Sequence, residues 1–172
     1  METKTVKQSK VVIKDNYLSE QEFEKVQNIF FDSKLSWQLK YGVAYDHNGS
    51  LDDYFFGHLV YQYVPMSPHF ADIMNIFHPR FKSHVITRIK CNLYTRTSEI
   101  VKHDWHKDHD TLPVLNGALL MLNTCKGYTA FEDGEKVESV ANRMVFFDSL
   151  KLHHSTNTTN TSNRLTLNIN YI

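Results

Sequence analysis

The sequence predicts a mainly β protein with N-terminal helices, an α+β chain whose core is an antiparallel barrel or two-sheet jelly roll. Three observations support this fold class. Two helical patterns lie in the first half of the chain, before Pro79. From Val85 onward, apolar residues alternate with polar ones or form runs of strand length. No helical pattern separates these runs, so a parallel sheet with crossover helices fits less well.

Length and composition fit one globular domain over residues 1–172. Nineteen basic residues balance nineteen acidic ones, so nothing in the charge points to nucleic acid or a membrane surface as a partner. The first ten residues are polar, without the apolar segment of a signal peptide, and no apolar run is long enough to span a bilayer. Cys91 and Cys125 are isolated in apolar runs, as reduced core cysteines are. We therefore expect a cytoplasmic protein.

A short apolar run and a capping box organise the start of the chain. Val11–Ile13 predicts an edge strand. Ser19 and Glu22 have the Ser-x-x-Glu spacing of a capping box, in which each side chain bonds the other residue's backbone N–H. Apolar residues then recur at helical spacing: Phe23, Val26, Ile29 and Phe30. We expect an amphipathic helix that continues to about Ser33.

A second helix is predicted at Ser67-Pro68, an N-cap followed by proline at the first helical position. Its apolar face comprises Phe70, Ile73, Met74 and Phe77. It ends before Pro79, which cannot continue it. Residues 40–58 show no clear period, which is typical of a long surface loop, and we favour a substrate lid there. Residues 1–84 would then supply helical support and the lid, and residues 85–172 the jelly-roll core.

The C-terminal half has the pattern of consecutive short strands. A long alternating segment comes first, and a continuous apolar run follows it. Asp133-Gly134 is a strong signal for the turn of a hairpin. The predicted strands are Val85–Tyr94, Gly117–Leu122, Tyr128–Phe131, Val137–Val140, Met144–Phe147 and Leu165–Ile172.

Three histidines and three aspartates lie within residues 103–110, and these residue types are ligands of divalent metals. His106 and Asp108 form the one His-x-Asp of the sequence. Residues i and i+2 of a strand point to the same side, so both can reach one ion. A third ligand is available from His153 or His154. Two histidines and one carboxylate form the facial arrangement of non-haem Fe(II) enzymes that activate oxygen.

An arginine at the start of the last strand adds a second recognition element. Arg164 and Thr166 are two residues apart and therefore share one face of that strand. The planar guanidinium suits a carboxylate, which it binds through two parallel hydrogen bonds. Asn92 and Tyr94 share a face of the earlier long strand and can add hydrogen bonds. Beside an iron-type triad, this arrangement predicts a bound dicarboxylate.

Together these residues resemble the Fe(II)/2-oxoglutarate-dependent dioxygenases, whose pattern is His-x-Asp/Glu, a distant His, then Arg-x-Ser/Thr on a double-stranded β-helix. Within that superfamily the chain is similar to the small prolyl-4-hydroxylase-like branch of microbes and their phages. The likeness covers about residues 85–172, with a weaker match in the N-terminal helix. It is carried by Asn92–Thr95, His106–Asp108, Leu122-Asn123, Gly127–Phe131, Phe147–Ser149 and Arg164–Tyr171.

The resemblance implies that His106, Asp108 and His153 bind Fe(II). His153 is favoured over the alternative, His154, by its spacing from the preceding Phe-Asp pair and from Arg164. Adjacent residues of a strand face opposite ways, so only one of the two histidines can be a ligand. His103 and His109 are expected to be partly exposed neighbours of the triad. Asp104 and Asp110 are expected to be solvated charges or hydrogen-bond partners of the ligands.

The resemblance also implies the co-substrates. Arg164 would pair with the distal carboxylate of 2-oxoglutarate, together with Thr166, Tyr94 and Asn92. The implied reaction consumes O2, converts 2-oxoglutarate to succinate by decarboxylation, and hydroxylates an unactivated C–H of the substrate. Ascorbate is the expected accessory reductant.

The expected substrate is peptidyl proline or a related amino-acid side chain, and a small-molecule substrate is the alternative. Aromatic residues near the triad and in the lid are the candidates for substrate contacts: Trp105, Tyr41, Tyr45 and Tyr54. Two rival hypotheses assume the same jelly-roll fold but a different function. One is a cupin-like metal isomerase or hydrolase, which does not need Arg164. The other is a non-catalytic binding module, which does not need the intact triad.

Overall fold

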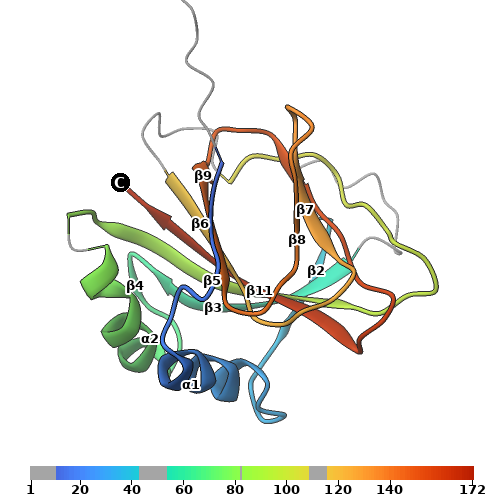
Figure 1. The fold of residues 1–172 in the computed structure, drawn as a ribbon. Coiled ribbons are helices and arrows are strands. Elements are labelled where there is room, and N and C mark those ends of the chain that lie inside the picture. Colours follow the sequence, from blue (N-terminus) through green and yellow to red (C-terminus); the bar gives the residue numbers. More distant parts are fainter. Residues whose placement is uncertain (1–10, 43–53, 82, 109–115) are drawn as a thin grey trace, which may run out of the picture.

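The structure is a computed structural model that describes residues 11–42, 54–81, 83–108 and 116–172. Within these ranges the strands form two antiparallel sheets, as Figure 1 shows. A group of buried apolar side chains from β6, β7, β8 and β9 packs the two sheets against each other. The mainly β, antiparallel architecture predicted from the sequence is confirmed, and it is consistent with a jelly-roll core.

The larger sheet has eight strands within the described residues, in the order β1-β9-β6-β11-β5-β3-β2, with β4 paired to β3. Its strands are β1 (Val12–Lys14), β2 (Gln38–Tyr41), β3 (Tyr54–Gln62), β4 (Val64–Pro65), β5 (Ile86–Thr95), β6 (Asn116–Met121), β9 (Arg143–Asp148) and β11 (Asn163–Tyr171). The smaller sheet has the order β10-β7-β8, with β7 (Tyr128–Phe131), β8 (Lys136–Glu138) and β10 (His153–Ser155). β1 lies at an edge, as predicted.

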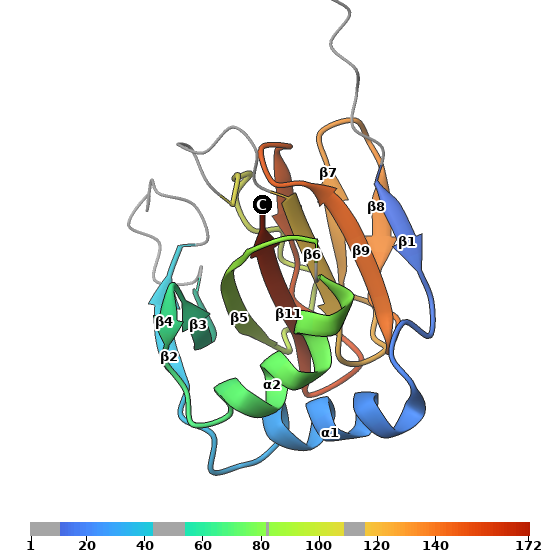
Figure 2. The ribbon, with the colours of Figure 1, turned by 90° about the vertical axis from the view of Figure 1, so that its left-hand side faces the viewer.

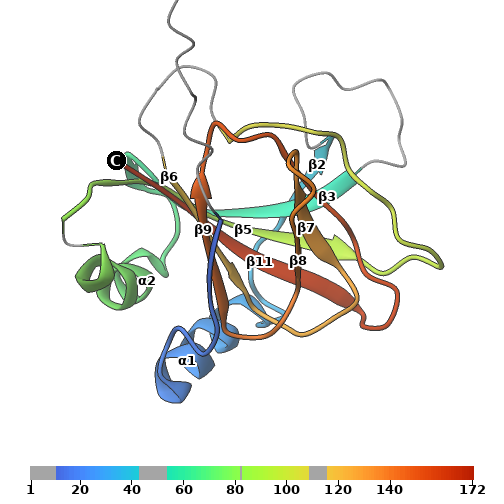
Figure 3. The ribbon, with the colours of Figure 1, turned by 45° about the horizontal axis from the view of Figure 1, so that its top comes forward.

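Two helices cover one face of the larger sheet. Figure 2 and Figure 3 show α1 (Glu20–Phe30) and α2 (Phe70–Phe77) on that face, with β7 and β8 on the other side. The main core lies between the helices and the sheet, and its buried members include Val26, Phe30, Ile73, Phe77, Leu120, Leu165, Leu167 and Ile169. Neither of these helices has the length and apolar character that crossing a membrane would require.

The start of α1 has the predicted capping box. Glu22 N donates to Ser19 Oγ at 3.4 Å, and Ser19 N donates to Glu22 Oε2 at 3.0 Å. The two bonds satisfy N–H groups that the helix itself leaves without partners. The helix ends at Phe30, three residues before the predicted end at Ser33.

The start of α2 differs from the prediction. The helix begins at Phe70, with His69 rather than Ser67 at its N-cap. The Ser67 hydroxyl is used in the preceding turn, where it accepts from His69 N at 3.2 Å and contacts His58 Nε2 at 2.9 Å. The α-helix ends at Phe77 as predicted, and a single 3-10 turn, His78–Arg80, includes Pro79.

The prediction of a loop over residues 40–58 is wrong at both ends. Lys40 and Tyr41 belong to β2, and β3 begins at Tyr54. β2 has no buried face and therefore no alternating pattern, because it is an exposed edge strand. In β3, Gly57 and His58 interrupt the apolar pattern. The predicted lid between the two strands, with Tyr45, lies outside the described residues.

The predicted strands of the C-terminal half are present with small shifts at their ends. The turn between β7 and β8 falls at Asp133-Gly134 as predicted. Gly134 has a φ of 89°, which glycine adopts without strain.

β11 separates an apolar face of the sheet from a polar one. Its odd-numbered residues from Leu165 to Ile169 pack in the core beneath the helices. The alternate residues therefore point to the interior between the two sheets, and all four are buried: Arg164, Thr166, Asn168 and Asn170. β5 pairs with this strand, so its even-numbered residues from Arg88 to Tyr94 face the same interior. Asn92 lies opposite Thr166, and Tyr94 lies opposite Arg164. The inward-facing polar side chains of these two strands form the floor of the candidate site, which is called the polar floor below.

Asn142 fixes the segment that leads into α1, and its replacement by alanine should destabilise the protein. Asn142 Nδ2 donates to Leu18 O at 2.8 Å, and its Oδ1 accepts from Leu18 N at 2.9 Å. Asn142 also has a φ of 61°, which alanine adopts poorly. Asn142→Ala should lower the free energy of unfolding by about 2–4 kcal/mol, measured by urea denaturation.

Asn142→Gly is the matched variant, because glycine accepts the positive φ and removes the same two hydrogen bonds. Its free energy of unfolding should lie between those of the wild type and Asn142→Ala. A loss of less than about 0.5 kcal/mol for Asn142→Ala would contradict this role.

Candidate metal centre

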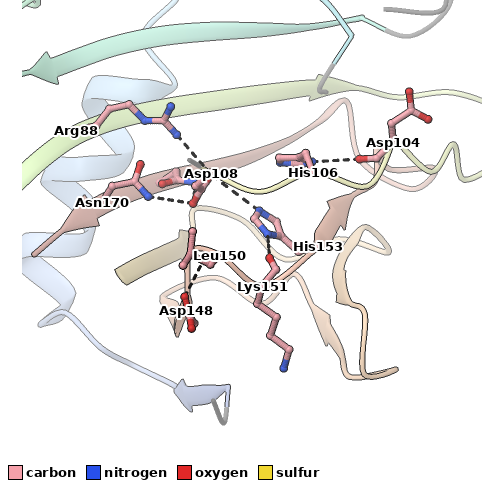
Figure 4. Close-up of polar contacts among 10 residues, drawn as sticks. Arg88, Asp104, His106, Asp108, Asp148, Leu150, Lys151, His153 and Asn170 are labelled. Carbon is pink, nitrogen blue, oxygen red and sulfur yellow. Dashed lines mark hydrogen bonds and ion pairs between the residues drawn. The ribbon is translucent and has the colours of Figure 1, made fainter. Parts of the chain in front are cut away.

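The segment from Val101 to Asp108 is held in place by backbone hydrogen bonds to the segment around β10. His106 N donates to His153 O at 2.9 Å, and His153 N donates to His106 O at 3.0 Å. Asp108 N donates to Ser149 O at 3.1 Å. This antiparallel pairing brings residues more than forty positions apart to one end of the inter-sheet space. Figure 4 shows the resulting arrangement around Asp108.

Three metal-ligand side chains converge there. One donor atom each from His106, Asp108 and His153 lies within 4.8 Å of the others. His153 Nε2 is 3.9 Å from Asp108 Oδ1, and the two imidazole rings are 4.5 Å apart between centroids. Asp108 and His153 are buried, and His106 is partly buried. The structure therefore brings together the three residues that the sequence singled out.

The turn after β9 and two carbonyl groups orient the histidines. His106 Nδ1 lies 3.1 Å from Asp104 O, and His153 Nδ1 lies 2.9 Å from Lys151 O. A carbonyl oxygen only accepts, so Nδ1 carries the proton in each neutral ring and Nε2 keeps its lone pair for a metal. The turn itself is closed by Asp148, whose carboxylate accepts from Leu150 N at 2.9 Å, as Figure 4 shows.

The Asp108 carboxylate is held by side chains of β11 and β5. Asn168 Nδ2 donates to both of its oxygens at 3.2 Å, and Asn170 Nδ2 donates to Oδ2 at 3.0 Å. Arg88 Nη2 lies 3.5 Å from Oδ1. These three residues were not among the candidates from the sequence. The signal was present, because Asn168 and Asn170 continue the alternation that begins at Arg164.

The surroundings keep these ligands in the forms that bind a metal. Burial alone would raise the pKa of Asp108, but His153, Arg88 and the hydrogen bond from Asn170 together lower it. Burial and the neighbouring His153 lower the pKa of His106 to about 4. At neutral pH the site therefore offers a carboxylate and a neutral imidazole from this segment.

The remaining members of the histidine and aspartate cluster lie outside the triad. The His154 ring points away from it and contacts the rings of Trp105 and Tyr128, at 4.5 Å and 5.9 Å between centroids. His103 is buried with its ring 5.1 Å from Tyr94, so the expectation that it is partly exposed is wrong. Asp104 is exposed and contributes its backbone carbonyl. His109 and Asp110 are outside the described residues.

Arg164 is fully buried beneath β7 and β10. Its Nη1 donates to Thr156 O and its Nη2 to Thr129 Oγ1, both at 2.9 Å, and its Nε has no partner. The Tyr94 ring lies 5.6 Å from the guanidinium carbon. No carboxylate among the described residues pairs with it. Burial lowers the pKa of Arg164, although Tyr94 and Cys125 oppose this.

A pocket of about 110 Å³ opens beside the triad. His106, Asp108, Asn92 and Tyr94 line it, whereas Thr166 and Arg164 are buried and do not line it. The other lining residues are Phe55, Arg88, Lys90, Lys107 and Asn168. The pocket is therefore polar, with one aromatic wall.

The aromatic residues proposed for substrate contacts do not line this pocket. Trp105 is 49% exposed and packs on His154, and Tyr41 and Tyr54 are exposed near the ends of β2 and β3. Phe55 lines the pocket instead of Tyr54, because neighbouring residues of a strand face opposite sides.

The three donors fit divalent iron. Two imidazoles and one carboxylate on one side of an ion leave its other positions open for further ligands. Bonds of about 2.1 Å would draw the three donor atoms closer together than they lie in the structure. The hydrogen bonds to Asp108 and to both Nδ1 atoms supply the outer interactions that metal ligands need.

Comparison with known proteins identifies the fold of the chain. No protein-family model and no curated protein matches the sequence. Among solved structures, a 2OG-Fe(II) oxygenase-family oxidoreductase from Burkholderia pseudomallei superposes with a TM-score of 0.73 at 11% identity, covering 94% of this chain and 84% of that one.

Two further structures show the range of activities on this fold. The viral collagen prolyl hydroxylase of Paramecium bursaria Chlorella virus-1 has a TM-score of 0.61 at 12% identity and covers 94% of each chain. The α-ketoglutarate-dependent epimerase SnoN of nogalamycin biosynthesis has a TM-score of 0.69 at 12% identity, covering 96% of this chain and 77% of that one. The protein thus has the fold of the 2-oxoglutarate/Fe(II) oxygenases, which its neighbours use for more than one reaction.

Removal of one hydrogen bond to Asp108 should weaken metal binding. Asn170→Ala deletes the 3.0 Å bond to Oδ2 and should raise the Kd for Mn(II), measured by calorimetry, about 10- to 100-fold. Asn163→Ala, on the same strand but outside the polar floor, is the matched control and should bind like the wild type. Equal affinities for all three proteins would contradict the role of Asn170.

The low pKa of His106 predicts how the stability of the metal-free protein depends on pH. The pKa is lowered from 6.5 to about 4 in the folded chain. Between these values the unfolded chain binds a proton at His106 that the folded chain does not, so stability should fall as the pH is lowered from about 6.5 to 4.

Urea denaturation in the presence of a chelator measures this dependence. His106→Gln should have a flatter pH profile over the same interval. Profiles of equal slope would show that His106 is not held neutral.

Proposed function

We propose that this protein is an Fe(II)- and 2-oxoglutarate-dependent dioxygenase that hydroxylates an unactivated C–H. The observation that carries the proposal is the convergence of His106, Asp108 and His153 beside a pocket, in the fold of such oxygenases. On this proposal the chain is one oxygenase domain with a double-stranded β-helix core.

His106, Asp108 and His153 would hold the metal on one side, with the pocket on the other. When bound, Fe(II) and 2-oxoglutarate supply the oxidising chemistry, in which O2 is consumed and 2-oxoglutarate is decarboxylated to succinate. The residues around the triad hold the ligands in position, since Asn168 and Asn170 fix the carboxylate. Because these two side chains are buried, they keep water from that side of the site.

Arg164 is the proposed receptor for the distal carboxylate of 2-oxoglutarate. A guanidinium has five N–H donors, and oxygen atoms of Thr156 and Thr129 accept from two of its nitrogens. The cation is fully buried without a carboxylate among the described residues, and an unpaired buried charge is costly. A dicarboxylate would remove that cost. Gly127 leaves the space that the guanidinium arm occupies, since a Cβ there would lie 2.5 Å from Arg164 Cδ.

Tyr94, Thr166 and the side-chain Nδ2 of Asn92 complete the proposed co-substrate site, because a carboxylate needs hydrogen-bond donors. Tyr94 lies between the pocket and the buried Arg164, because it lines the pocket and its ring is beside the Arg164 guanidinium. Burial raises the pKa of Tyr94, although Arg164 opposes this, so its hydroxyl remains a hydrogen-bond donor at neutral pH. A cupin-like isomerase or hydrolase would use the triad without needing a buried arginine. Peptidyl proline or a related amino-acid side chain is one candidate substrate, and the viral prolyl hydroxylase among the similar structures supports it.

The direct test is formation of succinate from 2-oxoglutarate by the purified protein with Fe(II), ascorbate and O2. Slow succinate formation is expected even without the true substrate, and it should stop when a chelator is added. No succinate, together with no binding of 2-oxoglutarate to the metal-loaded protein, would contradict the proposal.

Replacement of Arg164 should weaken co-substrate binding without loss of the metal. Arg164→Met should raise the Kd for 2-oxoglutarate about 10- to 100-fold, because a charge-assisted hydrogen-bonded pair is lost. The Kd for Mn(II) should change little. Calorimetry on the metal-loaded protein measures both constants.

Arg164→Lys keeps the charge without the planar fork and should give an intermediate Kd. Arg143→Met is the control, since Arg143 pairs with Asp15 at the surface. Wild-type affinity for 2-oxoglutarate in a folded Arg164→Met protein would exclude Arg164 as the receptor.

A further inference from the structure

The pocket contains cations that neither the metal nor 2-oxoglutarate requires. Arg88 and Lys90 of β5 line it on the same face as Asn92 and Tyr94, and Lys107 lines it from the segment that carries the triad. Asp108 is the one carboxylate among the described lining residues, and it is committed to the metal.

The pocket has more positive charge than the metal and 2-oxoglutarate need for neutrality. A divalent ion, the Asp108 carboxylate, a doubly negative 2-oxoglutarate and the Arg164 guanidinium sum to no net charge. The charges of Arg88, Lys90 and Lys107 remain. Arg88 is already directed at Asp108, so Lys90 is the cation that is both partly buried and available.

Lys90 is held in a defined position. Its side chain crosses β3 at Gly57, where a Cβ would lie 2.9 Å from Lys90 Cε, and its Nζ lies 4.5 Å from the centroid of the Phe55 ring. Within the described ranges no carboxylate comes within ion-pair distance of this ammonium group. Burial and the nearby Arg88 and Lys40 lower the pKa of Lys90 to about 8, so it is still mainly protonated at pH 7.

Two hydrogen-bond acceptors without partners line the same pocket as Lys90. Asn92 Oδ1 and Asn168 Oδ1 are buried and have no hydrogen-bond partner, and both residues line the pocket. Asn168 lies opposite Lys90 in the pairing of β11 with β5. Its amide orientation is fixed, since Nδ2 must face the Asp108 carboxylate. Buried acceptors without partners are costly, and N–H donors of a bound ligand would satisfy them.

We propose that Lys90 binds a carboxylate of the substrate and that Asn92 Oδ1 and Asn168 Oδ1 accept from its amino group, so that the enzyme acts on a free amino acid in place of peptidyl proline. The inference rests on the proposed function and names the substrate class of that site. A free amino acid carries both groups on one carbon atom, whereas a residue within a peptide carries neither.

The reaction then balances as a hydroxylation. One atom of O2 enters a C–H bond of the amino acid and the other enters succinate, while 2-oxoglutarate loses CO2. Two electrons come from the C–H bond and two from the oxidative decarboxylation.

The test compares each of the twenty L-amino acids with its primary amide, using the Fe(II)-loaded protein with 2-oxoglutarate and O2. The amide keeps the side chain and the amino group but lacks the anionic carboxylate. Readouts are succinate formation and a mass gain of one oxygen atom in the probe. At least one acid should stimulate succinate formation and gain oxygen, and its amide should be at least about tenfold less effective.

Lys90→Met should raise the KM for that acid about 10- to 100-fold, and its Kd for 2-oxoglutarate should stay within about twofold of the wild type. Lys14→Met is the matched control, because Lys14 also lies over a phenylalanine ring, at 5.3 Å from the Phe146 centroid on β9. It should behave like the wild type. Gly57→Ala displaces the Lys90 side chain without removing its charge and should also raise the KM for the acid.

A panel in which no acid outperforms its amide would overturn the inference. It would also be overturned if Lys90→Met raised the Kd for 2-oxoglutarate as strongly as Arg164→Met does, since Lys90 would then be the co-substrate receptor. These outcomes leave the proposed function standing as long as the wild type binds 2-oxoglutarate and forms succinate. If the wild type neither binds 2-oxoglutarate nor forms succinate, both the inference and the proposed function are overturned.

Discussion

The buried carboxylate of Asp108 is the group on which the rest of the site depends. A carboxylate between two sheets needs hydrogen-bond donors, and Asn168, Asn170 and Arg88 supply them from the two central strands. This requirement accounts for the two asparagines on the inner face of β11, Asn168 and Asn170. The larger apolar cluster lies on the opposite face of the sheet, beneath α1 and α2. The helices thus bury the apolar face of the sheet, while its other face carries the polar residues of the site.

Metal and co-substrate recognition come from two different sets of elements. The triad depends on the pairing of the segment before Asp108 with β10, a connection made by backbone bonds. Arg164 and the asparagines depend on the register of β11 against β5. A shift of one residue in that register would turn all of these side chains into the apolar core. The geometry of the pocket is therefore fixed by the best-paired part of the sheet.

Much of this could be predicted from the sequence, because it depends on alternation and on local motifs. The period of two placed Arg164 and Thr166 on one face, and the capping box at Ser19 marked the start of α1. The same alternation contained Asn168 and Asn170, which went unnoticed because no motif drew attention to them. β3 was missed, since Gly57 and His58 interrupt its pattern. Spacing along the sequence favoured His153 over His154, and the structure places His153 with His106 and Asp108.

The measurement that tests the central claim most directly is a crystal structure grown without oxygen in the presence of Mn(II) and 2-oxoglutarate. We predict one ion bonded to His106, Asp108 and His153, with the distal carboxylate of 2-oxoglutarate against Arg164. An ion bonded to His154, or a carboxylate bound at Lys90 with Arg164 left unpaired, would contradict this account.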